Sequence, residues 1–230
     1  MAEERWLEWD GCVNVRDLGG LPTAKGQQIR PGALVRADST YKLTEAGWAA
    51  ARDHGITTVI DLRHPREAEE QPITAPLEIA VVALPVEDQD DTAFVERWGA
   101  QLATPHYYPD ALDRFADRVA AVVTAVAQAP PGGVVVQCVA GRDRTGMVTA
   151  LLLSLAGVDP ELIAADHALS YQRLPFLHGD HGPGLDDGWE ADHAAALTTL
   201  LAGMDVASYL GDAGVTAPDV EALRARFVSD

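Results

Sequence analysis

The sequence predicts an α/β fold, with a central, mainly parallel sheet flanked by helices and a helical C-terminal part covering the functional site. Short apolar, β-branched runs alternate with segments of helical periodicity, which is the pattern of parallel sheets. Hydrophobic residues make up 47% and charged residues 23% of the 230 residues, as in ordinary globular proteins. No repeat, low-complexity tract or linker-like stretch is present, so we expect residues 1–230 to form one domain.

The first half of the chain predicts one helix and two strands. Residues 43–55 (LTEAGWAAARDHG) favour a helix, with Thr44 as N-cap and Gly55 where a C-terminal glycine ends it. Residues 56–62 (ITTVIDL) are apolar and β-branched, which predicts a buried strand. Residues 79–86 (IAVVALPV) predict a second buried strand, ended by proline and the acidic run EDQDD.

The second half predicts one strand among helices. Apolar residues at helical spacing predict one long amphipathic helix over residues 110–128. The third strand is GVVVQC, residues 133–138, and it follows the turn PPGG. Further helices are predicted over residues 145–156, after the Asp159-Pro160 start, and after the capping box that begins at Thr216, with a loop over residues 175–188.

The chain is strongly acidic, with 17 Lys and Arg against 35 Asp and Glu and a formal net charge of -18. Nucleic acids attract basic surfaces, so we expect none as a partner. The charge also disfavours adsorption to an anionic membrane, although a local basic pocket could persist within the acidic envelope. The longest apolar run, near residues 150–155, is too short to span a bilayer, and no integral membrane contact is expected. The start MAEERWLEWD lacks signal-peptide features and the chain has two cysteines, so we expect a cytoplasmic protein, with leaderless export left open.

Cys138 follows the third predicted strand and precedes a predicted helix. In α/β sheets, ligands bind beyond the carboxyl ends of strands, often at the N-terminus of the next helix. The backbone N–H groups of residues 139–144 would converge there, and such a nest binds a tetrahedral oxyanion such as phosphate. Gly141 permits the tight curvature. The predicted phosphate-binding loop consists of Val139, Ala140, Gly141 and Arg142.

Arg144 stands six residues after Cys138. Its guanidinium can bind two phosphate oxygens at once, which lysine cannot do. The loop amides, the helix dipole and this guanidinium lower the pKa of the thiol, so that the thiolate is present at neutral pH. Thr145 can donate a hydrogen bond to the sulfur or to an attacking water. These residue types at this spacing predict displacement at phosphorus by sulfur.

The Cys-x5-Arg-Thr-Gly spacing is the signature of the cysteine-dependent phosphatases. The chain resembles one branch closely, the atypical bacterial protein tyrosine phosphatases, whose loop reads HCxAGKDRTG. NVRDLGG (residues 14–20) resembles the family's NFRDLGG. Residues 30–39 (RPGALVRADS), 55–67 (GITTVIDLRHPRE), 166–171 and 206–224 match further blocks in order, so that the resemblance covers nearly the whole chain.

This resemblance implies a cysteine-dependent phosphatase-like fold, with no metal and no cofactor. It implies substrates that range over phosphotyrosine, sometimes phosphoserine or phosphothreonine, and phosphoinositides. A phosphorylated protein, a phosphoinositide or a small phosphorylated metabolite is therefore the expected substrate. The sequence does not indicate the oligomeric state.

Two loop positions depart from the family. Gln137 replaces its histidine, and because glutamine carries no charge we expect the pKa of the Cys138 thiol to exceed that of relatives. Arg142 replaces its lysine and keeps the positive charge that the family links to inositol phosphate headgroups. We expect a weakened but active enzyme. The alternatives are a phosphate-binding module without turnover, motivated by Gln137, and sulfur or arsenate transfer, which ordinarily needs further thiols.

Three carboxylates are candidates for the proton donor that the leaving group needs. The resemblance implies Asp143, inside the loop. Asp61, at the end of the strand over residues 56–62, is the second candidate, in an acid or a supporting role. Asp88, in the acidic run, is the third. The segment DLRHPRE is otherwise read as a helix start, with Glu67 complementing the helix dipole.

A metal site is not predicted. The side chains that could suggest one lack the spacing of known ligand patterns. They are His178, His181 and His193 with Asp180 and Asp186.

The N-terminal NVRDLGG segment leaves two questions open. It is either only a strand and a tight turn, or it also orders the site through Arg16 or Asp17. If it lies near the loop, Cys12 could form a protective disulfide with Cys138, although a reduced bystander is the favoured reading.

Overall fold

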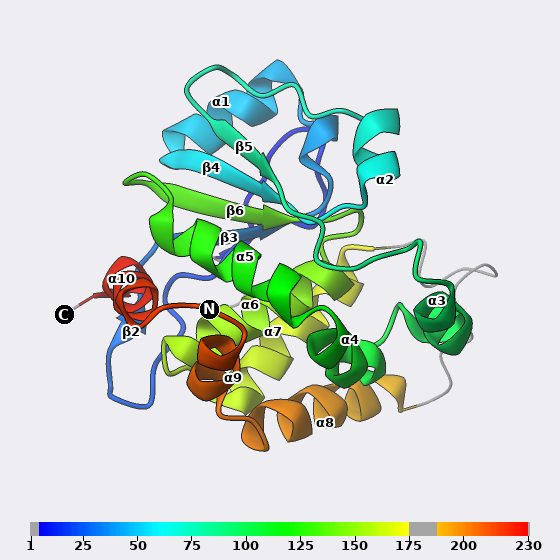
Figure 1. Cartoon of the computed structure of the whole chain (residues 1–230). Coiled ribbons are helices and arrows are strands. Elements are labelled where there is room, and N and C mark those ends of the chain that lie inside the picture. Colours follow the sequence, from blue (N-terminus) through cyan, green and yellow to red (C-terminus); the bar gives the residue numbers. More distant parts are fainter. Residues whose placement is uncertain (1–4, 175–187, 230) are drawn as a thin grey trace.

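The computed structural model describes residues 5–174 and 188–229, and its centre is a five-stranded sheet with helices on both faces (Figure 1). The strand order is β1-β3-β6-β4-β5, parallel throughout except that β1 runs antiparallel to β3. A two-stranded sheet joins β2 to β7. The strands are β1 (Arg16–Asp17), β2 (Gln28–Ile29), β3 (Leu34–Ala37), β4 (Ile56–Asp61), β5 (Ala80–Ala83), β6 (Gly133–Gln137) and β7 (Val228–Ser229). The predicted α/β class with a mainly parallel sheet is confirmed.

The helices form two layers (Figure 1). On one side lie α1 (Glu45–Asp53) and α2 (Pro65–Glu70). The larger layer on the other side contains α3 (Thr92–Trp98), α4 (Tyr108–Arg114), α5 (Ala116–Gln128), α6 (Asp143–Leu155), α7 (Pro160–Gln172), α8 (Trp189–Ala202), α9 (Val206–Asp212) and α10 (Ala217–Phe227). Short 3-10 turns are η2 (Thr40–Lys42), η3 (Gly99–Gln101) and η4 (Pro105–Tyr107).

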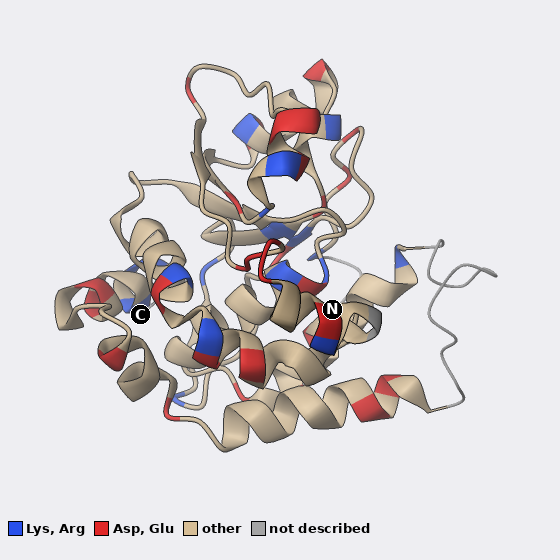
Figure 2. Cartoon of the chain, turned by 45° about the vertical axis from the view of Figure 1, so that its right-hand side comes forward, with Lys and Arg blue, Asp and Glu red and all other residues tan. Residues whose placement is uncertain are grey.

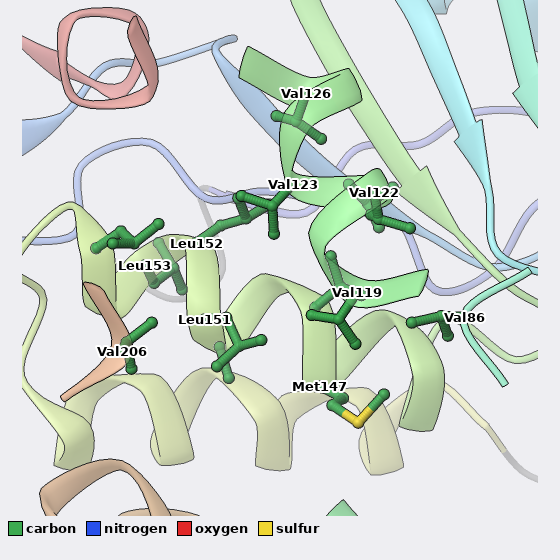
Figure 3. Close-up of a cluster of buried hydrophobic side chains, with 14 of the residues drawn as sticks. Val86, Val119, Val122, Val123, Val126, Met147, Leu151, Leu152, Leu153 and Val206 are labelled. Atoms are coloured by element: carbon green, nitrogen blue, oxygen red, sulfur yellow. The ribbon is translucent and has the colours of Figure 1, made fainter. Parts of the chain in front are cut away.

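The central strand β6 is buried on both faces, which explains its uninterrupted valine run. Val134 and Val136 belong to the larger hydrophobic cluster, whereas Val135 belongs to the smaller cluster with Trp48 and Ala51 of α1. This alternation follows the two-residue period of a strand. In the larger cluster, side chains of α5 face those of α6 (Figure 3), among them Val119, Val122, Val123, Met147 and Leu151.

Local signals located several elements correctly. The Thr44 hydroxyl accepts a hydrogen bond from the Gly47 N–H at 3.3 Å and begins α1, and Gly55 follows the helix with φ of +85°. β4 and β6 form where the β-branched runs predicted them. A reciprocal capping box between Thr216 and Asp219 begins α10.

The predicted helix over residues 110–128 is wrong, because two helices occupy this segment. α4 already begins at Tyr108, and the chain leaves helical geometry at Phe115, with φ of -118° and ψ of 31°, before α5 begins. The Phe115 ring packs edge-to-face on Phe94, with 5.0 Å between the ring centroids. This tertiary contact accompanies a break that helical periodicity does not reveal.

The predicted buried strand over residues 79–86 is shorter and more exposed than expected. β5 has only 4 residues and pairs with β4 alone, at the edge of the sheet. Val81 is 40% exposed there. An apolar run therefore did not distinguish an edge strand from a central one.

None of the helices in the described ranges is by itself long and apolar enough to cross a membrane, whereas α8 and α9 satisfy length and composition only as a pair bent by 69°.

Candidate active site

Cys138 comes directly after β6, at the carboxyl end of the central strand and between the ends of β3 and β4. The residue is 2% exposed. Residues 139–142 form a loop, and α6 begins at Asp143, two residues before the predicted start. In Figure 2, both basic (blue) and acidic (red) residues are found at this end of the sheet. The nucleophile candidate thus lies where ligands bind in α/β folds.

Side chains from the N-terminal segment bind the carbonyl oxygens of this loop. The Asn14 amide donates to the Ala140 carbonyl at 2.8 Å, and the Ser39 hydroxyl lies 3.0 Å from the Cys138 and Val139 carbonyls. Arg36 Nη2 donates to the Gly141 carbonyl at 3.0 Å. The sequence alone did not indicate these roles for Asn14, Arg36 and Ser39. The indication that the sequence did contain was that these residues fall within the family-like blocks NVRDLGG and RPGALVRADS.

The backbone N–H groups of the loop are left available by this arrangement. None of those on residues 139–142 donates a hydrogen bond to another residue in the described ranges. Gly141 has φ of +66°, and an added Cβ would lie 2.5 Å from the backbone of Ala37 and Asp38. Glycine is therefore required at Gly141 by both backbone conformation and space. Free amides beside a helix N-terminus form an anion-binding site.

Arg144 is oriented by a carboxylate of α2. Glu67 accepts from Arg144 Nη1 at 2.6 Å and from Nη2 at 3.0 Å, so that it occupies the end of the guanidinium. Burial acts to lower the pKa of Arg144, but the Glu67 hydrogen bonds and the nearby Cys138 raise it above the ordinary value. The Nε atom has no partner in the described part of the chain, which leaves the Nε–Nη2 edge for two phosphate oxygens. The sequence had suggested only a helix-start role for Glu67.

Asp143 is the first residue of α6, directly after the loop, and its carboxylate is paired with the adjacent Arg142. Arg142 donates from Nε and Nη2 to the two carboxylate oxygens at 2.8 and 2.9 Å. The Asp143 side chain is 16% exposed, so the carboxylate remains accessible. The Arg142 guanidinium lies 5.0 Å from the ring centroid of Tyr171, which fixes it from the side of α7.

Asp61 is placed behind the loop, in a closed polar cluster. Arg63 donates to its carboxylate from Nε at 3.0 Å and from Nη2 at 2.9 Å, and the Gln137 amide donates to the same carboxylate. The side-chain oxygen of Gln137, Oε1, accepts a hydrogen bond from the Thr40 N–H at 3.1 Å. Gln137 thus joins β4 and η2 beneath Cys138. The Asp61 carboxylate is thus occupied by Arg63 and Gln137, and the Asp61 side chain is only 4% exposed. This geometry favours the more accessible Asp143 over Asp61 as proton donor.

The remaining candidates occupy different positions. Asp88 pairs with Arg118 at 2.6 Å. The Thr145 hydroxyl is buried and, among the residues that the structure describes, has no hydrogen-bond partner. It is therefore available to a thiolate or to a water, although no hydrogen bond to the Cys138 sulfur is present.

A buried charge cluster ties α7 to the loop. Asp166 binds Arg16 at 3.1 Å and Arg36 at 3.0 Å, and Arg36 in turn holds the Gly141 carbonyl. Burial acts to raise the pKa of Asp166, but Arg16 and Arg36 lower it well below its usual range. Arg16 thus contacts the residues that order the loop. Asp17 instead holds the Gly19 and Gly32 N–H groups at 2.8 and 2.7 Å.

Replacing Asp166 by Asn is expected to lower the free energy of unfolding by about 3–5 kcal/mol, because it leaves two buried guanidinium groups without their counter-charge. Urea denaturation measures this loss. Asp159→Asn is the matched control, because Asp159 begins the same helix without a side-chain capping bond. Equal stability of the two variants would contradict the structural role of the Asp166 cluster.

The histidine-rich segment was not predicted to hold a metal. His178, His181, Asp180 and Asp186 lie outside the described residues. His193 accepts or donates a hydrogen bond at 2.8 Å with the Tyr171 hydroxyl. The absence of a metal stays a prediction.

Cys12 is a free thiol, as is Cys138. Its sulfur lies 3.5 Å from the Ser39 carbonyl oxygen. Burial, followed by the charge of Asp38, raises the pKa of Cys12 well above the usual range. A thiol that resists ionisation is a poor partner for disulfide exchange, which favours the reduced bystander.

Comparison with known proteins agrees with this geometry. The family model described as "Tyrosine phosphatase family" matches residues 7–229. The triple specificity protein phosphatase PtpB of Mycobacterium tuberculosis is 32% identical over an alignment of 224 residues, gaps included, and the match covers 84% of this chain and 79% of that protein. A putative tyrosine-protein phosphatase of Cupriavidus necator is 29% identical over 73% of this chain and 63% of its own length. A tyrosine-protein phosphatase of Nostoc commune is 27% identical over 90% of this chain and 78% of its own length. The chain therefore belongs to the tyrosine phosphatase family, in its atypical bacterial branch.

Proposed function

We propose that the protein hydrolyses phosphate monoesters through a phosphocysteine intermediate on Cys138. One observation carries the proposal: a thiol at the end of β6 lies beside a loop with free amides and an arginine that Glu67 holds in place. The family membership supports the same reaction class. Nothing in the comparisons favours a phosphate-binding module that has lost turnover.

The first step transfers the phosphoryl group to sulfur. The Cys138 thiolate attacks phosphorus, the S–P bond forms and the P–O bond to the leaving group breaks. Asp143 gives its proton to the leaving oxygen. The loop amides and the free edge of Arg144 bind the non-bridging oxygens, where charge must be stabilised.

The second step returns the enzyme to its starting state. The Asp143 carboxylate, now a base, takes a proton from water as the water attacks the phosphocysteine. The S–P bond breaks, inorganic phosphate leaves, and the thiolate and the protonated Asp143 are restored. The Thr145 hydroxyl, which has no hydrogen-bond partner within residues 5–174 and 188–229, supports the departing thiolate by donating a hydrogen bond to it.

We propose phosphotyrosine in proteins as the favoured substrate, rather than phosphoserine, phosphoinositides or small phosphorylated metabolites. The 2% exposure of Cys138 supports this, because the longer aryl arm reaches a recessed sulfur more easily than an alkyl side chain does. In buffer with EDTA, a phosphotyrosine peptide is expected to exceed the matched phosphoserine peptide, a phosphoinositide and a sugar phosphate by roughly tenfold or more in kcat/KM. An equal or higher value for any of the other three contradicts this substrate choice.

Asp143→Asn is expected to lower kcat/KM, which reports the first phosphoryl transfer, about 10²–10⁴-fold for an alkyl phosphate, because a poor leaving group needs a proton. The loss is expected to be much smaller for p-nitrophenyl phosphate, whose leaving group is stable as an anion. Steady-state kinetics on both esters measures the difference. Asp61→Asn is the comparison, and it should show no such dependence on the leaving group. The reverse result would assign the donor role to Asp61.

We propose further that the chain acts in the cytoplasm as one phosphatase domain. Both cysteines are free thiols, which supports a reducing compartment. The family model extends over residues 7–229 without a second unit.

A further inference from the structure

Glu87 is a buried carboxyl group next to the candidate active site: the ring of its partner Tyr107 lies 5.0 Å, centroid to centroid, from the ring of Tyr108, whose hydroxyl donates to the Asp143 carbonyl at 2.9 Å. Glu87 lies in the segment after β5 and is 6% exposed. Its one side-chain partner among the described residues is the Tyr107 hydroxyl of η4, which donates to the carboxylate at 2.6 Å. Arg118 of α5 binds the Glu87 carbonyl at 3.1 Å and fixes the backbone, while the neighbouring Asp88 turns to that same arginine. The segment thus directs Glu87 inward.

The charged side chains that act on the Glu87 carboxyl belong to the candidate active site. Arg144 attracts its carboxylate, whereas Glu67, and Asp143 when it is ionised, repel it. The two repelling carboxylates each have a cation of their own, since Glu67 binds Arg144 and Asp143 binds Arg142. Among the residues that the structure describes, the Glu87 carboxyl has only the neutral hydroxyl of Tyr107 as a side-chain partner. It is therefore the carboxyl of this group that lacks a counter-charge in contact.

Burial raises the pKa of Glu87 to about 7, although Arg144 and the Tyr107 hydrogen bond act to lower it. The carboxyl is consequently neutral below about pH 7 and ionised above it. Ionisation places a new negative charge near Arg144, where a phosphate dianion must bind. A carboxylate there competes for the guanidinium and repels the substrate.

We propose that Glu87 is a positioning residue of the reaction proposed above, whose neutral carboxyl leaves Arg144 to the phosphoryl group and whose ionisation weakens substrate binding. This inference rests on the proposed function, because it assumes that Arg144 binds the phosphoryl group. It concerns substrate binding rather than the chemical step, so its mark is a pH-dependent KM. Glu87 itself does not touch the reacting atoms.

The test compares wild type with Glu87→Gln on p-nitrophenyl phosphate. Glutamine keeps the size and the acceptor for Tyr107 but cannot ionise. For wild type, KM is expected to rise at least about tenfold between about pH 6 and about pH 8.5, as one group with a pKa near 7 ionises. For Glu87→Gln, this part of the rise should vanish, while kcat stays near the wild-type value. A Glu87→Gln variant whose KM follows the wild-type pH profile overturns the proposal.

Two further variants sharpen the comparison. Tyr107→Phe removes a hydrogen bond that favours the ionised form, so the rise in KM should move to higher pH. Asp88→Asn alters the adjacent carboxylate that pairs with Arg118, and it should keep the wild-type profile. Thermal unfolding of each variant at both pH values shows that the fold is retained. An unshifted Tyr107→Phe profile counts against the proposal.

Two outcomes separate this inference from its foundation. If Glu87→Gln loses kcat on an alkyl phosphate but keeps it on p-nitrophenyl phosphate, Glu87 is a proton donor and the positioning role is wrong. If Cys138→Ser turns over like wild type, the proposed function fails, whatever the Glu87 profile. A dead Cys138→Ser variant beside an unchanged Glu87→Gln profile removes the Glu87 inference alone.

Discussion

Replacing Cys138 by serine is expected to lower kcat for p-nitrophenyl phosphate by at least about 10³-fold in buffer with EDTA. A serine hydroxyl ionises far less readily than a thiol, so the loop amides and Arg144 cannot convert the hydroxyl at position 138 into an anionic nucleophile. Stopped or continuous release of p-nitrophenolate measures the loss. EDTA removes any contribution from a divalent metal ion.

The matched control is Cys12→Ser, the other free thiol of the chain. Its turnover should equal that of wild type, since burial raises the pKa of the Cys12 thiol and its sulfur lies against the Ser39 carbonyl. Binding of vanadate or inorganic phosphate by Cys138→Ser shows that the loop remains folded. A Cys138→Ser enzyme with the wild-type rate contradicts nucleophilic catalysis by sulfur.

Arg144→Lys is expected to lower kcat/KM by about 10²–10⁴-fold. A guanidinium can bind the Glu67 carboxylate with one edge and two phosphate oxygens with another, whereas an ammonium has no such geometry. Kinetics on p-nitrophenyl phosphate measures the loss. The thermal midpoint of the variant, taken in parallel, separates a catalytic loss from unfolding.

Two comparisons make the Arg144 result specific. Arg118→Lys changes an arginine that binds the segment after β5 instead of the phosphate loop, so a small effect is expected. Glu67→Gln keeps the charge of Arg144 but weakens its orientation, so its loss should lie between those of wild type and Arg144→Lys. A rate for Arg144→Lys close to that of wild type contradicts bidentate phosphate binding.

The parts of the fold that depend on neighbouring residues were predicted from the sequence. The hydroxyl of Thr44 caps α1, the Thr216 box begins α10, and the valine run forms β6, because each signal lies within a few residues of its effect. The break at Phe115 was not predicted, since it accompanies packing against Phe94 from another helix. The edge position of β5 was also missed, because strand order is a tertiary property.

The site divides in the same way. Cys138, Arg144 and the loop follow from spacing within a single segment. The residues that hold this loop do not, because Glu67 lies 77 positions from Arg144 and Asn14 lies 126 positions from Ala140. Glu87 was passed over for Asp88 because sequence does not show which of two adjacent carboxyl groups points inward. Burial and charge partners decide that choice.

Gln137 has a structural role in addition to the effect that its sequence context suggested. As a replacement for the family histidine, it suggested a less acidic Cys138 thiol and a weakened enzyme. In the structure its amide joins Asp61 to the Thr40 N–H, directly beneath the nucleophile. Gln137 therefore supports the start of the loop through hydrogen bonds made by both the N–H and the oxygen of its side-chain amide.

The most direct test of the central claim is the detection of the phosphocysteine itself. Asp143→Asn enzyme, mixed with p-nitrophenyl phosphate and quenched in acid, should gain the mass of one phosphoryl group, because this variant lacks the base that directs water onto the intermediate. Peptide mapping should place that group on Cys138, and Cys138→Ser should gain none. Steady turnover by wild type with the phosphoryl group on another residue, or with no covalent intermediate in either enzyme, would contradict the account.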